Sequence, residues 1–164
     1  MSATEYPLKQ IIEVKQKRVE AAEKVVKERQ LVLKAEKKKL EEREAERDKV
    51  KNHKKDKLQQ LRDIVDAGTT SPKIQQMKGY LKLVDEKLLI EEKKVRDQTG
   101  IVTNAEKQLE AAELELHQKR QEADKLLMHQ KDWEREQRKE AEIIEGREQD
   151  ELGSMIYTSR NRKK

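Results

Sequence analysis

Histidine is the residue type here that is best suited to bind a metal or to move protons near neutral pH. The sequence has three histidines, His53, His117 and His129, and no cysteine. His129 follows His117 by twelve residues, which is about 120° around a helix once whole turns are removed, so the two cannot share a metal on one helix. We therefore expect all three to face solvent, with no metal site and no cofactor.

Aspartate and glutamate are abundant, and paired carboxylates can act as general acid and base. Such a pair needs a pocket that excludes water. Charged residues make up 45% of the 164 residues and aromatic residues 2%, too few large apolar side chains for a globular core. The sequence also contains no P-loop, dinucleotide fingerprint or nucleophile elbow. The chain is therefore expected not to be an enzyme.

Apolar residues recur every seven positions in two long stretches, 8–66 and 73–151. Such a repeat forms a seam that must pack against another helix. The predicted seam positions of the first stretch are Ile12, Val19, Val26, Leu33, Leu40 and Leu61. Those of the second are Ile74, Leu81, Leu88, Val95, Val102, Leu109, Leu116 and Leu126. Because 39 basic and 34 acidic residues nearly cancel, the sequence favours helix over disorder.

One break, residues 67–72, separates the two stretches. Gly68 suits a left-handed cap for the first helix, and Ser71 followed by Pro72 suits the start of the second. Residues 1–66 carry a net charge of +5 and residues 73–152 a net charge of −4. These opposite charges favour pairing within one chain, so we expect a monomer with weak self-association.

The predicted fold is all-α: a long antiparallel two-helix coiled-coil hairpin, an extended rod. It forms a single domain over residues 1–164. Its parts are a helix over about 8–66, a loop at 67–72, a helix over about 73–151 and a basic tail at 153–164.

Pairing around the predicted loop matches residues whose numbers sum to about 139, so Leu8 lies near Lys131. Trp133 is the only tryptophan, and packing on Leu8 and Ile11 is favoured over contact with a partner. Large apolar residues beyond it have no partner within the hairpin, which predicts contact with another protein. With Trp133, these candidate contacts are Ile143, Ile144, Met155, Ile156 and Tyr157.

Three charged residues, Arg43, Arg47 and Lys54, occupy predicted core positions of the first helix. They face an acidic region that contains Asp85, Glu91 and Glu92. Long side chains that reach solvent are favoured there, and a charged layer that fixes the register is the alternative.

A lysine-rich run contains Lys49, Lys51, Lys54, Lys55 and Lys57. A solvated helix face is favoured over a docking surface for an acidic partner. Nucleic-acid binding comes last, because acidic residues interleave and no aromatic residues accompany the lysines. No apolar run is long enough to span a bilayer, and residues 1–5 lack the features of a signal peptide, so we expect a cytosolic protein.

Several segments resemble the YscO/FliJ family, the stalk proteins of bacterial type III secretion and flagellar export. The resemblance covers nearly the full length and is closest to YscO-like members of obligate intracellular bacteria. The segments that carry it are Tyr6-Pro7-Leu8, residues 18–28, 46–53 and 77–84, the loop Gly68-Thr69-Thr70-Ser71, and residues 148–151.

The resemblance implies an antiparallel coiled coil like that of the F1 ATPase γ subunit, without catalytic residues. It implies docking into the hexameric export ATPase and a link to the cytosolic domain of the export gate. Secretion chaperones and the needle-length regulator are further implied partners. The implied location is the bacterial cytoplasm, at the secretion apparatus on the inner membrane. A coiled-coil scaffold without an export role is the alternative function, and weak polyanion binding is a third.

Overall fold

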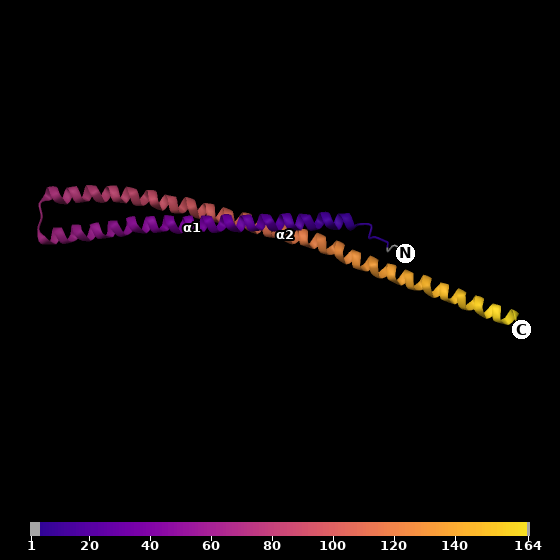
Figure 1. Ribbon diagram of the computed structural model, residues 1–164. Helices are drawn as coiled ribbons and strands as arrows, with labels where there is room; N and C mark the ends of the chain where they lie inside the picture. The colour runs from indigo at the N-terminus through magenta and orange to yellow at the C-terminus, as the bar shows by residue number, and fades with distance from the viewer. Residues whose placement is uncertain (1–3, 164) are drawn as a thin grey trace. The chain divides into compact units, whose positions relative to one another are not determined.

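Two long helices make up nearly all of the computed structural model, which describes residues 4–163. Helix α1 spans Lys9–Ala67 and helix α2 spans Ser71–Arg162, and residues 4–163 contain no strand. The helices are antiparallel and packed as a hairpin (Figure 1), which confirms the predicted fold class. No helix within residues 4–163 combines the length and the apolar character that crossing a membrane requires.

Contacts group the chain into two units. Unit 1 contains residues 1–23 and 115–164, and unit 2 contains residues 24–114. In a pair of helices, each residue contacts only neighbours on its own helix and residues directly opposite. Contacts therefore stay local along the pair and can separate into units without a break in either helix.

The connection between the helices is shorter than predicted. Gly68 adopts a φ of +80° and its N–H donates to the carbonyl of Val65 at 3.2 Å, the predicted left-handed cap. The carbonyl of Thr70 accepts the N–H four residues on at 3.3 Å, so Thr70 is the N-cap in place of Ser71. Threonine caps helices well, and Pro72 still lies in the first turn, where its missing N–H is not needed.

Helix α2 continues through Gly146 and Gly153 to Arg162, past the predicted end at residue 151. The predicted basic tail is therefore helical as far as residue 162, and Lys164 lies outside the described residues. A glycine inside a helix costs about 1 kcal/mol relative to alanine. The strong helix formers on either side of each glycine outweigh that cost, so α2 is not interrupted at either glycine.

A row of apolar side chains fills the space between the helices of unit 2. The buried members are Val26, Val50, Leu81, Val84, Val95, Val102, Ala105 and Ala112. The other predicted seam residues of this unit, Leu33, Leu40, Leu61, Ile74, Leu88 and Leu109, are half-buried. Since each helix covers only one side of the other, the core is one layer thick.

One polar residue, Gln98, is buried within this row, with 8% of its surface exposed. Its Nε2 donates to the backbone carbonyl of Glu36 at 3.0 Å and to Glu36 Oε2 at 2.6 Å. These bonds avoid the cost of an unpaired buried amide. They form only when the two residues lie opposite each other, so the pair favours one register of the helices.

The charged layer, which was the alternative to side chains that reach solvent, forms only in part. Lys54 makes an ion pair with Asp85 on the opposite helix, as expected. Arg47 pairs instead with its own neighbour Asp48, at 3.2 Å. Arg43 is exposed, as the favoured interpretation expects, because a long arginine side chain can carry its charge out to solvent.

In unit 1 the first turns of α1 pack on the part of α2 that begins at residue 115. Its buried apolar residues are Tyr6, Ile12, Leu116 and Ala123, and the seam residues Val19 and Leu126 are half-buried. Two ion pairs join the helices, Lys15 to Glu122 at 2.9 Å and Arg120 to Glu23 at 3.1 Å. The residue numbers of two side chains that contact each other across the helices add up to between 133 and 143, close to the predicted sum of 139.

The Lys15–Glu122 pair predicts a dependence of unit 1 stability on pH. The hydrogen bond from Lys15, followed by the charge of Lys119, lowers the pKa of the Glu122 carboxyl below its ordinary value of 4.5. Because the pKa of Glu122 is lower in the folded state, the ionised carboxylate stabilises the fold at pH values above the unfolded-state pKa. This stabilisation is lost as the pH falls through the folded-state pKa. We expect Glu122→Gln to lower the melting temperature slightly at pH 7 and to have no effect well below pH 4.5.

Thermal melts of both proteins, followed by circular dichroism at several pH values, measure this difference. Glu5→Gln is the matched control, because that exposed carboxylate only approaches Lys9 of its own chain segment, at 3.9 Å. A Glu122→Gln deficit that persisted unchanged at low pH would contradict the assignment.

Candidate partner-binding site

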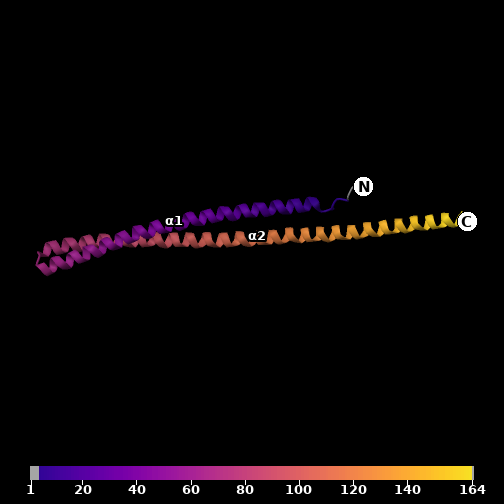
Figure 2. The same ribbon diagram turned by 60° about the horizontal axis from the view of Figure 1, so that its bottom comes forward.

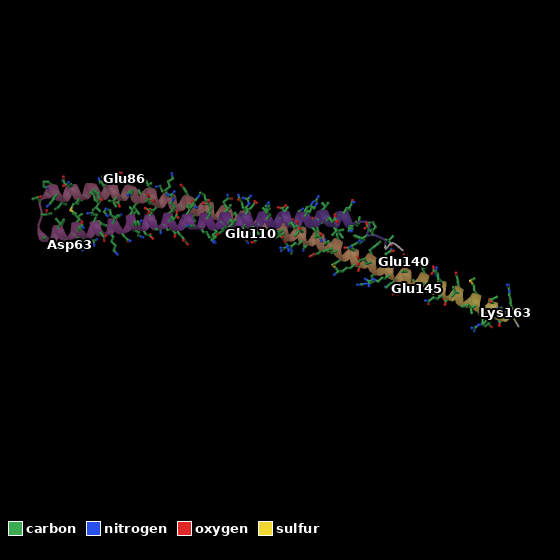
Figure 3. The ribbon with its side chains drawn as sticks, viewed as in Figure 1. Asp63, Glu86, Glu110, Glu140, Glu145 and Lys163 are labelled. Carbon is green, nitrogen blue, oxygen red and sulfur yellow. The ribbon has the colours of Figure 1, made fainter. Side chains whose placement is uncertain are left out.

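The candidate site is the C-terminal part of α2 in unit 1. Every one of residues 138–163 except Gly146 is exposed. In Figures 1 and 2 this part of α2 continues beyond the N-terminal end of α1. Figure 3 labels Glu140, Glu145 and Lys163 along it. Its side chains are therefore available to another molecule.

An aromatic cluster, formed by Tyr6, His129 and Trp133, lies where this exposed part begins. Tyr6 is only 5% exposed, and its hydroxyl is hydrogen-bonded to Nδ1 of His129. The ring centroids of Tyr6 and Trp133 lie 5.4 Å apart, in an edge-to-face arrangement. Trp133 is half-buried as a result.

The ring of Trp133 packs on Tyr6, a contact that the sequence did not predict. Packing of Trp133 on Leu8 and Ile11 stays a prediction; Leu8 is half-buried and Ile11 is 44% exposed. A turn precedes α1, in which the N–H of Lys9 donates to the carbonyl of Tyr6 at 3.2 Å. This turn folds Tyr6 back onto α2, a position that the heptad repeat does not describe.

The three histidines are exposed, and two of them contact tyrosines. His53 Nε2 lies 2.7 Å from the Tyr80 hydroxyl, while His129 contacts Tyr6. Their surroundings contain no set of ligands: within residues 4–163, no three histidine, aspartate or glutamate side chains are grouped so that they could hold a metal ion.

The cluster can be tested with the single tryptophan as a reporter. Replacing Tyr6 with alanine removes the ring that covers Trp133, so we expect the fluorescence emission of Trp133 to shift to longer wavelength. Losing a buried aromatic side chain also costs about 3 kcal/mol, which should loosen the N-terminal turn. Tyr157→Ala is the control, because Tyr157 is 69% exposed, and an unchanged spectrum for Tyr6→Ala would contradict the packing.

A hollow of about 720 Å³ connects the cluster to the exposed part of α2. Tyr6, Trp133, Ala141 and Ile144 supply its apolar lining, and charged side chains such as Arg138 line it as well. An apolar hollow with charged edges can receive an apolar side chain of another protein while the charges orient that protein.

The candidate contact residues do not all lie on one side of α2. Trp133, Ile144 and Met155 are spaced by eleven residues, about three helical turns, so they follow one another along one face. We call this the Trp133 face. Ile143 and Tyr157 point to a different side, since they lie about 80° and about 120° around the helix from Trp133, the nearest of those three.

The Trp133 face also includes Leu152, which lies about 60° around α2 from Met155 and is 63% exposed. Ile156 is 50% exposed but lies about 100° around α2 from Met155, so it is outside this face. Leu152 was absent from the predicted contacts, although its spacing of three residues from Met155 was a usable signal. The face therefore continues the seam of α2 past the last residues that α1 covers.

Charge changes sign along the same part of α2. Residues 140–151 contain six acidic side chains and one basic one, whereas Arg160 and Arg162 occupy the last turn. Complementary charges steer and orient association more than they strengthen it. The arrangement is suited to directional protein–protein contact.

Known proteins are similar to this chain in sequence and in fold. The family model described as YscO-like protein matches residues 3–163. CT670 of Chlamydia trachomatis, described as a homolog of YscO, is 45% identical, with a TM-score of 0.91 over 99% of this chain and 100% of that chain. A chain in the structure of the Chlamydia pneumoniae CdsV and CdsO protein complex is 51% identical, with a TM-score of 0.50 over 51% of this chain and 98% of that chain. No curated protein matches. The chain belongs to the YscO-like family of type III secretion proteins.

Proposed function

We propose that this chain is the non-catalytic stalk of a type III secretion system, which couples the hexameric export ATPase to the export gate. The observation that carries the proposal is the YscO-like match over residues 3–163. The two-helix hairpin supports it, because such a fold offers long contact surfaces.

The C-terminal part of α2 is the part that we assign to the ATPase ring. Its Trp133 face is apolar and exposed although the rest of the α2 seam is covered, which is the arrangement expected of a surface that a partner buries. The acidic segment 140–151 and the basic last turn would set the direction of insertion.

Other surfaces would serve the export-gate cytosolic domain, secretion chaperones or the needle-length regulator. A relative of this chain occurs in the CdsV and CdsO protein complex, which supports a function carried out through protein–protein contacts. The corresponding location is the cytoplasmic side of the secretion apparatus at the inner membrane.

The test is to mix the full-length chain with the purified hexameric export ATPase from the same bacterium. We expect co-elution in size-exclusion chromatography and an increase in ATP turnover. A coiled-coil scaffold without an export role would show neither, and would form a stable homodimer in sedimentation. Absence of both binding and stimulation would overturn the proposal.

A further inference from the structure

Unit 2 carries an apolar groove on the side of α1, which the proposed contact with the ATPase leaves unused. We call it the lysine-rimmed groove. Leu31, Leu33 and Leu109 provide its floor, and Lys34, Lys37 and Lys38 stand around it. Its volume is about 730 Å³, and all of its lining residues except Leu109 belong to α1.

Leu31 marks this groove as unusual for a solvated helix face. It lies five residues after the seam residue Val26, so it points away from α2, and it is 68% exposed. Leu33, two residues further on, is half-buried at the seam. The lining therefore combines one outward-facing leucine of α1 with leucines of the seam, and polar side chains of the same turns of α1 line the groove as well.

The positive charge at the rim is compensated only in part. Among the ion pairs formed within residues 4–163, none involves Lys34, Lys37 or Lys38. Lys39, by contrast, pairs with Glu36 at 3.6 Å. The only acidic residue of the lining is Glu41, so the groove has a net charge of +2. An apolar floor inside a basic rim is complementary to an apolar stripe flanked by carboxylates.

We propose that the lysine-rimmed groove binds an acidic amphipathic helix of a partner protein. The lining runs along α1 from residue 30 to residue 41, about three turns. A helix laid along it would meet it with apolar side chains at i, i+3 or i+4, and i+7, the spacing used when helices bind grooves. This proposal does not depend on the ATPase contact.

Two other occupants fit the groove less well. A second copy of this chain carries the same net charge of +5, which opposes association of like molecules. Single-stranded nucleic acid binds through bases stacked on aromatic side chains, and the lining of the groove contains no aromatic residue.

The test uses a fluorescent helical peptide of about 20 residues, long enough to form helix, with leucine at seam positions and glutamate and alanine elsewhere. A second peptide carries lysine in place of glutamate. We expect the full-length chain to bind the acidic peptide in fluorescence anisotropy and not the basic one. Lys34→Glu with Lys38→Glu should weaken binding by about 10-fold or more, and Leu31→Ser should weaken it at unchanged charge.

The matched control is Lys51→Glu with Lys55→Glu. These two exposed lysines have the same spacing and the same charge change but do not line the groove. Equal losses in both double variants would mean diffuse attraction and would overturn the proposal. So would absence of binding to the acidic peptide. Sedimentation tests a third outcome. If the wild-type chain were a dimer and the Lys34/Lys38 double variant a monomer, the groove would bind a second copy of the chain, which would also overturn the proposal.

Discussion

Replacing Ile144 and Met155 together with aspartate is expected to weaken binding to the hexameric export ATPase by about 100-fold or more, since central apolar contacts cost about 2 kcal/mol or more each when lost. Ile144 and Met155 are 55% and 70% exposed and follow Trp133 along one face of α2. A charge on that face would have to be buried without a partner when the complex forms. Titration of the labelled chain with the ATPase measures the change.

The control for this variant is Leu83→Asp with Leu89→Asp in unit 2. Leu83 and Leu89 are 63% and 61% exposed, so the control makes a similar apolar-to-acidic change at an exposed part of α2. Both double variants should remain helical by circular dichroism, because exposed helix positions tolerate aspartate at a cost below about 1 kcal/mol. Equal binding by wild type and by Ile144→Asp with Met155→Asp would remove the assignment of the Trp133 face to the ATPase.

Replacing Val102 with aspartate is expected to lower the free energy of unfolding of unit 2 by about 3 kcal/mol or more. Val102 is 6% exposed in the row of apolar side chains between the helices. A carboxylate there is either buried without a partner or forces the helices apart. Since single domains are stable by only about 5–15 kcal/mol, such a loss is large.

Urea unfolding followed by circular dichroism measures this effect, with Thr103→Asp as the control. Thr103 is the next residue along α2 and is exposed, so its replacement should change the free energy of unfolding by about 0.5 kcal/mol or less. If the two variants unfolded at the same urea concentration, the seam could not be what holds unit 2 together.

Much of the fold follows from local features. The seven-residue spacing of Ile74, Leu81, Leu88 and Val95 requires a helix with a buried side, and Gly68 supplies the left-handed residue that ends α1. The end of α2 was harder to predict. Gly146 and Gly153 suggested a stop, but the energy of an isolated glycine is small compared with the helix preference of the residues around it.

The candidate site, too, could be predicted from the sequence only in part. Its exposed apolar residues were predictable, because the unequal lengths of the two heptad stretches leave the second one without a partner at its end. Their distribution over two sides of α2 needed a continuous helix through residue 162. Only then does the spacing of Ile144 and Met155 place both residues on the face of Trp133.

The sequence by itself determined that this chain forms two helices joined by one short connection, because periodicity and capping depend on residues close together in the chain. Only the tertiary structure decided that Trp133 packs on Tyr6, that Gln98 bonds to Glu36 and that Arg43 stays outside the core. These contacts depend on which residues lie opposite each other. A heptad repeat specifies the side of a helix that packs, but the register is settled by the particular side chains that meet across the seam.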